Sequence, residues 1–515
     1  MNQAVQWLEQ QTHSILLYPL LFILSLFVVI SLKTSKVSKY RLPPSPTKLP
    51  LIGNLHQLHG LPHHAFLSLA KKHGPLMWLH LGLAPTLVVS SANIAQDVMK
   101  TYDHVFSSRP QLTFPKRLTY GKDIAFAPYG EYWRQVRKIC VLQLLSAKKV
   151  QSFRSIREEE IAIVVEKIKE SSSSNSVNLS EMFASLLTSI TCRVALGRKY
   201  NEEEGAGRKF KEMLKEFAYL LAVSNVGDLI PSLAWLNNLN GLSARVEKNF
   251  KELDSFLNEV IDERIEKNTT LGAVAGAETA AYFVDVLLGN ENDSTLGFSL
   301  AREDTKAIIL DMFGAGTDTS SVLLEWTMSE LLRHPKIMEQ VQTEVRDIAR
   351  GRQIVKEADI EQMQYLKSVV KETLRLHPPV PLLVPRESME DAKIQGYDIP
   401  AKTTVVINVF AIGRDPMLWD DPDKFCPERF LNGSCAKIDL KGQDFQLIPF
   451  GAGRRGCPGI LFALAVNELA LANLLNGFDW ALPDGLNGGD LDMHEASGIA
   501  IHRKNDLLLT AKPHY

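Results

Sequence analysis

One short segment places a cysteine between a glycine-rich turn and the expected start of a helix. It reads Phe-Gly-Ala-Gly-Arg-Arg-Gly-Cys-Pro-Gly, from Phe450 to Gly459. Glycines permit tight backbone paths and the close approach of a flat ligand, and Pro458 suits the first position of a helix. A helix start favours the thiolate form of Cys457, which is the form that binds metals. Cys457 is therefore a candidate metal ligand, the alternative being a capped helix with an incidental cysteine.

A second segment places hydroxyl and carboxyl groups in the middle of a long predicted helix, 302–333. It reads Ala-Gly-Thr-Asp-Thr-Ser, from Ala315 to Ser320. Small and hydroxyl-bearing residues weaken a helix interior. One functional explanation is that Gly316 lets a ligand approach closely, so that Asp318 and Thr319 can bond bound dioxygen or relay protons to it. The alternative is a small-residue face that packs tightly against a neighbouring helix.

Several charged residues are spaced so that they share a helix face. Glu372 and Arg375 are three residues apart, and Trp133 and Arg137 are four apart. A buried Glu–Arg pair needs further partners, and Arg429 in the segment Pro-Glu-Arg-Phe is a candidate. Arginine suits carboxylate recognition because it stays charged and donates in a fork. Arg386, which follows a proline-rich turn, is a further candidate. For both Arg137 and Arg386, the alternative is an ordinary arginine on the solvated surface.

The elements that must position these residues are mostly helical. Apolar periodicity predicts amphipathic helices over 245–267, 302–333, 336–350, 360–376 and 458–476. A hairpin is predicted from 76–81 and 86–90, and a further short strand over 403–409. The length of 515 residues would ordinarily suggest two or three domains.

Taken in order, these motifs resemble those of the cytochrome P-450 family. The cysteine segment is similar to F-x-x-G-x-R-x-C-x-G at every specified position, and residues 315–320 are similar to the family's A/G-G-x-D/E-T-T/S. The chain also resembles the family in its E-x-x-R, P-E-R-F and W-x-x-x-R elements. The segment Ala-Pro-Tyr-Gly-Glu-Tyr-Trp-Arg at 127–134 resembles plant microsomal members of the 71 clan. The resemblance implies a mainly α fold with small β-sheets, as one triangular haem domain.

The resemblance also implies roles for individual residues. It makes Cys457 the axial thiolate of a haem b iron, Thr319 the oxygen-activation threonine and Asp318 its acidic neighbour. It makes Glu372, Arg375 and Arg429 a structural network behind the haem. The expected haem-binding residues are Trp133, Arg137, Arg386, Phe450, Arg455, Cys457 and Gly459. The expected walls of a substrate pocket include Phe114, Phe313, Ala315, Val380, Leu382, Leu383 and Ile499.

The N-terminal region predicts attachment to a membrane. Residues 14–32 form an uncharged apolar run, which as a helix rises about 28 Å and matches the thickness of a bilayer. Basic residues follow it and favour a cytosolic body; a cleaved secretory signal would need a basic start and a small-residue cleavage site. We expect a lumenal segment 1–13, a transmembrane anchor 14–32, a basic and proline-rich hinge 33–54, and a cytosolic catalytic domain 55–515 on the endoplasmic reticulum membrane.

Composition and the absence of certain motifs limit the classes of binding partner that we expect. A net charge of −2 argues against nucleic-acid binding, and five cysteines without a C-x-x-C pair favour a reducing compartment. The sequence has no G-x-G-x-x-G after a predicted strand, so electrons from NADPH would come from a partner, the NADPH–cytochrome P-450 reductase. The implied reaction inserts one atom of O2 into an apolar terpenoid, phenolic, alkaloid or oxime.

Two other functions would use the same haem. One is dehydration or isomerisation of an oxime or peroxide without net oxygenation, and the other is a haem sensor or carrier. The intact pair Asp318 and Thr319 favours oxygenation over both.

Overall fold

The computed structural model describes residues 40–514, apart from 172–175, 201–204, 272–281 and 292–298. The predicted lumenal segment 1–13, the anchor 14–32 and the first part of the hinge lie outside the described residues. Residues 40–54 of the hinge are described, and they lie beside the small sheet. Asn54 ties them to it, because its backbone N–H donates to the carbonyl of His80 at 2.7 Å.

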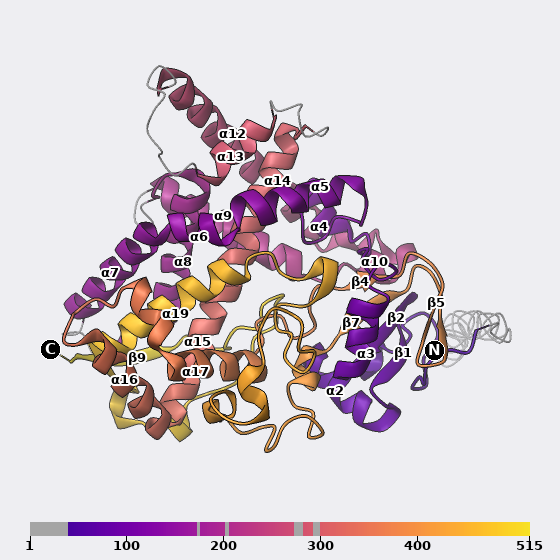
Figure 1. Ribbon diagram of the computed structural model, residues 1–515. Coiled ribbons are helices and arrows are strands. Elements are labelled where there is room, and N and C mark those ends of the chain that lie inside the picture. The colour runs from indigo at the N-terminus through magenta and orange to yellow at the C-terminus, as the bar shows by residue number, and fades with distance from the viewer. Residues whose placement is uncertain (1–39, 172–175, 201–204, 272–281, 292–298, 515) are drawn as a thin grey trace, which may run out of the picture.

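Helices make up most of the body, and Figure 1 shows that the body tapers toward α12 and α13. Their bounds are α2 Pro62–His73, α3 Ala92–Gln96, α4 Thr113–Leu118, α5 Glu131–Ile139, α6 Ala147–Ser152, α7 Arg154–Ser171, α8 Leu179–Leu196, α9 Gly205–Ala222, α10 Val226–Leu229, α11 Leu236–Leu239, α12 Leu242–Leu271, α13 Phe283–Glu291, α14 Arg302–Gly316, α15 Asp318–Arg333, α16 Pro335–Ala349, α17 Gln364–Leu376, α18 Val409–Ile412 and α19 Ile460–Gly477.

The strands are short and form small sheets at the edges of the helical body. Their bounds are β1 Leu76–Leu81, β2 Ala84–Val89, β3 Val177–Asn178, β4 Arg386–Glu387, β5 Ala392–Ile394, β6 Tyr397–Ile399, β7 Thr404–Ile407, β8 Phe478–Ala481 and β9 Leu508–Pro513. The largest sheet has the order β1-β2-β7-β4 and lies near the described N-terminal end (Figure 1). The predicted hairpin is confirmed as β1 paired antiparallel with β2.

The strand predicted over 403–409 ends earlier than expected. Strand β7 stops at Ile407, and the next residue, Asn408, caps helix α18 because its side chain accepts the N–H of Ala411. A side-chain oxygen at this position satisfies one of the free N–H groups of a helix start. The local capping signal therefore outweighs the apolar strand pattern.

The helix predicted over 302–333 has an irregularity at one residue. Helix α14 ends at Gly316 and α15 begins at Asp318, with Thr317 between them. The hydroxyl of Thr317 donates to the carbonyl of Phe313 at 2.6 Å, and that of Thr319 donates to Ala315 at 2.7 Å. Hydroxyl groups that bond back in this way bend helices. The prediction of a long helix over 302–333 is confirmed, with an irregularity at Thr317 beside the residues expected to carry chemistry.

The core lies among α8, the α14–α15 pair, α17 and α19. Helix α19 is apolar on all sides, as expected of a helix that is buried all round, and Val466, Leu469 and Leu475 are fully buried. Helices α8, α14 with α15, and α19 are long and apolar enough to cross a membrane. However, 56%, 56% and 67% of their most apolar windows are buried inside the fold.

Candidate active site

A large cavity lies between the break in the long helix and the cysteine loop before α19. Its empty space, the mouth included, is about 1560 Å³. Of the residues expected to form the site, the cavity is lined by Arg137, Ala315, Thr319, Val380, Leu383, Arg386, Phe450, Arg455, Cys457 and Gly459.

The cysteine loop is held in a fixed shape by its own backbone. The N–H of Cys457 donates to the carbonyl of Phe450 at 2.8 Å, and the N–H of Gly459 donates to the Cys457 Sγ at 3.3 Å. Gly453 has a φ of +66°, and a Cβ there would lie 2.2 Å from the carbonyl oxygen of Met99. Pro458 precedes α19, which begins at Ile460, so its predicted place inside the helix is wrong.

The Cys457 side chain is exposed, but toward the cavity. Burial raises the pKa of this thiol, while the N–H of Gly459 and the positive charge of Arg137 lower it. Burial outweighs the two favourable contacts, contrary to the expectation that the helix start would favour the thiolate. The thiolate therefore needs a further positive charge beside the sulfur, of the kind that a bound metal ion supplies.

Four arginines gather on the cavity wall: Arg137, Arg386 and Arg455, which were expected, and Arg109, which was not. Burial and the charge of Arg386 lower the pKa of Arg455 to about 9. Backbone carbonyls accept most of their hydrogen bonds, as where Arg137 donates to the carbonyl of Gly456 at 2.5 Å and Arg455 to that of Ala127 at 2.7 Å. Asp103 supplies a carboxylate to Arg386 at 3.0 Å. This much buried positive charge suits a ligand with more than one carboxylate.

Trp133 does not line the cavity. Its indole N–H donates to the carbonyl of Ile124 at 3.0 Å, and the guanidinium of Arg455 lies 3.9 Å from its ring centre. A guanidinium over an indole face is an attractive contact. Trp133 thus supports Arg455 from behind.

Asp318 and Thr319 point to different partners. Thr319 lines the cavity, whereas Asp318 does not. The Asp318 Oδ1 lies 2.7 Å from the Nε2 of His502, and the Nδ1 of His502 lies 3.5 Å from an oxygen of Glu325. Burial lowers the pKa of His502, but the two carboxylates outweigh it and raise that pKa to about 10. Sequence reasoning missed His502 because it lies far along the chain, in an irregular C-terminal segment without a motif.

The network predicted around Glu372 is present, and Glu372 and Arg375 are fully buried. Arg375 donates two hydrogen bonds to Glu372, both at 2.8 Å, and Arg429 donates a third at 3.1 Å. The N–H of Cys426 also donates to Glu372, at 2.8 Å. Arg375 further binds the carbonyls of Gly413, Pro422 and Lys424. The network therefore joins α17 to the segment that leads toward the cysteine loop, and it lies off the cavity.

The residues expected to form the substrate pocket divide into two groups. Ala315, Val380 and Leu383 line the cavity, as do Ile124, Met312, Leu323 and Val384. Phe313 instead packs edge-on against Phe210, with ring centres 5.2 Å apart. Leu382 packs beside β1, and neither Phe114 nor Ile499 lines the cavity.

Comparison with known proteins shows which family the chain resembles. A family model described as Cytochrome P450 matches residues 43–510. The chain is 51% identical to "Cytochrome P450 736A117" of Prunus mume, covering 100% of this chain and 99% of that protein. It is 53% identical to "Cytochrome P450 71A1" of Persea americana over 90% and 91% of the two chains. It is 49% identical to "Norfluorocurarine oxidase" of a Strychnos species over 94% and 95%. A zebra fish cytochrome P450 solved with progesterone superposes with a TM-score of 0.76 at 25% identity, over 88% of this chain and 100% of that one.

Proposed function

The chain belongs to the cytochrome P450 family, as a plant monooxygenase of the 71 clan, and from that premise we propose how its own residues act. We propose that haem b occupies the cavity with its iron on the Sγ of Cys457. One atom of O2 then enters a small apolar plant metabolite.

The observation that carries this proposal is the placement of one thiol and four arginines on the wall of one cavity. The thiol would bind the iron, and the arginines would pair with the two propionates. Gly316 also lines the cavity, and the space beside it is unfilled, because a Cβ at this glycine would meet no atom within 4 Å. Haem b matches this donor set, since it combines an iron, a flat ring and two carboxylates.

Each residue has a stated part in the proposed reaction. When bound, haem activates dioxygen and delivers one oxygen atom to the substrate. Arg109, Arg137, Arg386 and Arg455 hold the propionate edge. Thr319 presents its hydroxyl to the cavity while its hydrogen bonds Ala315. His502 is protonated near pH 7 and fixes the carboxylate of Asp318, the residue before Thr319 in the chain.

An apolar substrate fits the part of the cavity wall formed by α14, α15 and the turn after α17. Met312, Ala315, Leu323, Val380 and Leu383 contribute carbon surface there, and Thr319 is a nearby hydroxyl group. Such a wall favours terpenoid, phenolic, alkaloid or oxime substrates over charged ones. One relative is named for the oxidation of norfluorocurarine, which supports an oxidative role on a plant metabolite.

We propose that electrons reach the site from the NADPH–cytochrome P-450 reductase in the endoplasmic reticulum membrane. Lys138 and Lys148 are exposed near α5 and α6, which suits an acidic electron-transfer partner. Arg134 and Arg454 are about half exposed but are paired with Glu131 and Asp103, so they contribute less free charge.

The experiment is a screen of plant metabolites in microsomes containing the chain, the reductase and NADPH, under ¹⁸O2. One ¹⁸O atom per product molecule supports monooxygenation. Turnover that needs neither NADPH nor O2 would instead establish the dehydratase or isomerase reaction. In the same assay, Thr319→Ala should lower the product formed per NADPH consumed, and unchanged coupling would remove Thr319 from proton delivery.

A further inference from the structure

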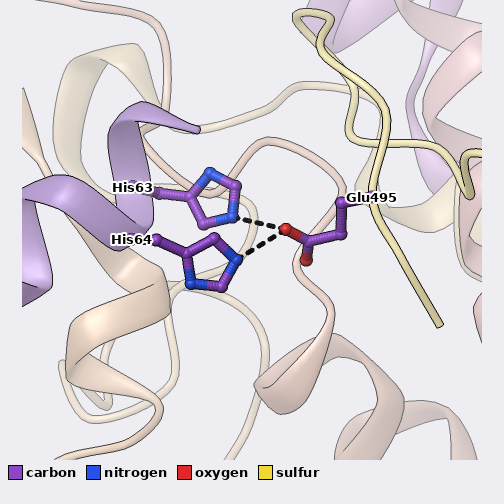
Figure 2. A group of neighbouring side chains, drawn as sticks. All are labelled: His63, His64 and Glu495. Atoms are coloured by element: carbon purple, nitrogen blue, oxygen red, sulfur yellow. Dashed lines mark hydrogen bonds and ion pairs between the residues drawn. The ribbon is translucent and has the colours of Figure 1, made fainter. Parts of the chain in front are cut away.

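A second group of metal-ligand side chains lies away from the cavity, at the start of α2. His63 and His64 are adjacent in the chain, and both point at Glu495 (Figure 2). The Nε2 of His63 lies 2.9 Å from the Glu495 Oε2, and that of His64 lies 2.8 Å from the same oxygen. The three ligand atoms all lie within 4.8 Å of one another.

The surroundings hold this geometry in place. His63 is buried, and Asn408 donates to its backbone carbonyl at 3.0 Å. The ring of Phe410 packs edge-on against both imidazoles, with ring centres 4.7 Å and 4.6 Å away. The side chain of Glu495 is 12% exposed, whereas that of His64 is 49% exposed. The site is therefore fixed on one side and open to solvent on the other.

We propose that His63, His64 and Glu495 bind a zinc ion, with water as the fourth ligand. Two imidazole nitrogens and one carboxylate oxygen form a donor set that zinc prefers, and an exposed side leaves the fourth position open. Tetrahedral zinc separates its ligand atoms by roughly 3.3 Å, so the present Nε2–Oε2 distances need to widen by about 0.5 Å. Rotation of the half-exposed His64 supplies part of that movement.

The competing arrangement is a purely hydrogen-bonded cluster. It requires both Nε2 atoms to carry hydrogen, so that two N–H groups share a single carboxylate oxygen. A zinc ion would bind the same three atoms as one doubly charged cation, and each imidazole would then carry its hydrogen on Nδ1. The nearby Arg414 opposes a cation, although its guanidinium is turned onto the Phe410 ring at 3.7 Å and is paired with Asp423 at 3.5 Å. Arg414 therefore lowers the expected affinity without excluding a cation from this site.

Zinc at this position would join the start of the body to its C-terminal segment. Glu495 lies on a hairpin-like loop in which the N–H of Ala496 donates to the carbonyl of His502 at 2.8 Å. The same loop carries the His502 side chain that pairs with Asp318 beside the cavity. A metal clamp on Glu495 thus restrains the loop that positions Asp318, without itself touching the cavity.

The test uses the full-length, haem-loaded protein in detergent, purified without a histidine tag. Zinc per haem is measured by elemental analysis after dialysis against a few µM Zn²⁺, with Mg²⁺ in excess. The proposal expects one zinc per haem, and at least a tenfold weaker affinity in His64→Ala and in Glu495→Gln. His59→Ala, which removes an exposed histidine just before α2, should bind zinc like the wild type.

X-ray absorption at the zinc edge separates this site from other zinc ligands. The proposal expects only nitrogen and oxygen neighbours near 2.0–2.2 Å, with imidazole scattering. A sulfur neighbour near 2.3 Å would place the zinc on a cysteine and overturn the assignment. Absence of stoichiometric zinc, or equal binding by wild type and His64→Ala, would also overturn it. Haem content measured in each variant shows whether the fold is intact.

Discussion

The ion pair between Asp318 and His502 gives Asp318 a partner that its sequence motif does not indicate. The motif predicted Asp318 as an acid beside Thr319, but the structure joins it to an imidazole from the C-terminal loop. The two carboxylates around His502 outweigh its burial and raise its pKa from the ordinary 6.5 to about 10. The imidazolium is thus the favoured form in the folded protein.

This raised pKa makes a contribution to stability that depends on pH. A group whose pKa is higher in the folded state stabilises fully below its unfolded pKa, and the effect disappears as pH rises through the folded pKa. The melting-temperature difference between wild type and His502→Gln should be constant below about pH 6.5 and shrink toward pH 10. Thermal melts across this pH range measure that difference, and His59→Gln, which replaces an exposed histidine, serves as the control. A difference that persists unchanged to pH 10 would refute the ion pair.

The residues that sequence could predict and those it could not differ in a physical way. Cys457, Thr319 and Arg137 stand in local patterns whose spacing has meaning by itself. Arg109 and His502 reach the site only because distant segments fold against it, and no neighbouring residue marks them. Local spacing also could not foresee that burial outweighs the helix start at Cys457, since burial depends on the whole fold.

Among the elements, the junction between α14 and α15 forms part of the cavity wall. Gly316 stands at the end of α14, where its missing side chain leaves the wall open. Gly316→Ala should leave the free energy of unfolding unchanged or raise it by up to about 1 kcal/mol, because alanine favours a helix. The added methyl group enters the cavity, so product formation should fall roughly ten- to hundredfold.

Gly314→Ala is the control, two residues earlier in the same helix. A Cβ there would lie 2.9 Å from the buried ring of Phe217, so crowding should destabilise the fold by about 1–3 kcal/mol. Urea unfolding together with turnover separates the two effects. Equal losses of stability in both variants would contradict the open wall at Gly316.

The Glu372 network tests how α17 is fastened to the cysteine region. Glu372→Ala leaves the fully buried Arg375 and the largely buried Arg429 without their carboxylate, which should cost about 3–5 kcal/mol. Glu247→Ala removes the partner of Arg117, where both side chains are more than 40% exposed, and should cost no more than about 1 kcal/mol. Urea midpoints and haem content check both; similar midpoints would show that the network contributes little.

At this scale, sequence patterns predicted which elements exist better than where they end. The β1–β2 hairpin and the helices α12, α16, α17 and α19 all appear near their predicted positions. Their limits depend on caps and back-bonded hydroxyls, as at Asn408 and Thr317. Those interactions involve single atoms, which periodicity does not encode.

For the whole molecule, length alone suggested several domains, but one helical body with small marginal sheets surrounds one large cavity. The predicted anchor 14–32 lies outside the described residues, and its role is testable by fractionation. Full-length chain should stay in the microsomal pellet after alkaline carbonate extraction, because an apolar helix of this length favours the bilayer. A chain that starts at residue 40 should be partly released, and release of both chains alike would contradict a spanning anchor.

The most direct test of the account is the absorption spectrum of the reduced protein with carbon monoxide. A thiolate on the haem iron gives a red-shifted Soret band, so the wild type should show this band and Cys457→Ala should lose it. Cys435→Ala, a partly exposed cysteine with no place in the site, should keep the band. A wild type without the shifted band, or a Cys457→Ala variant that retains it, would show that Cys457 is not the iron ligand.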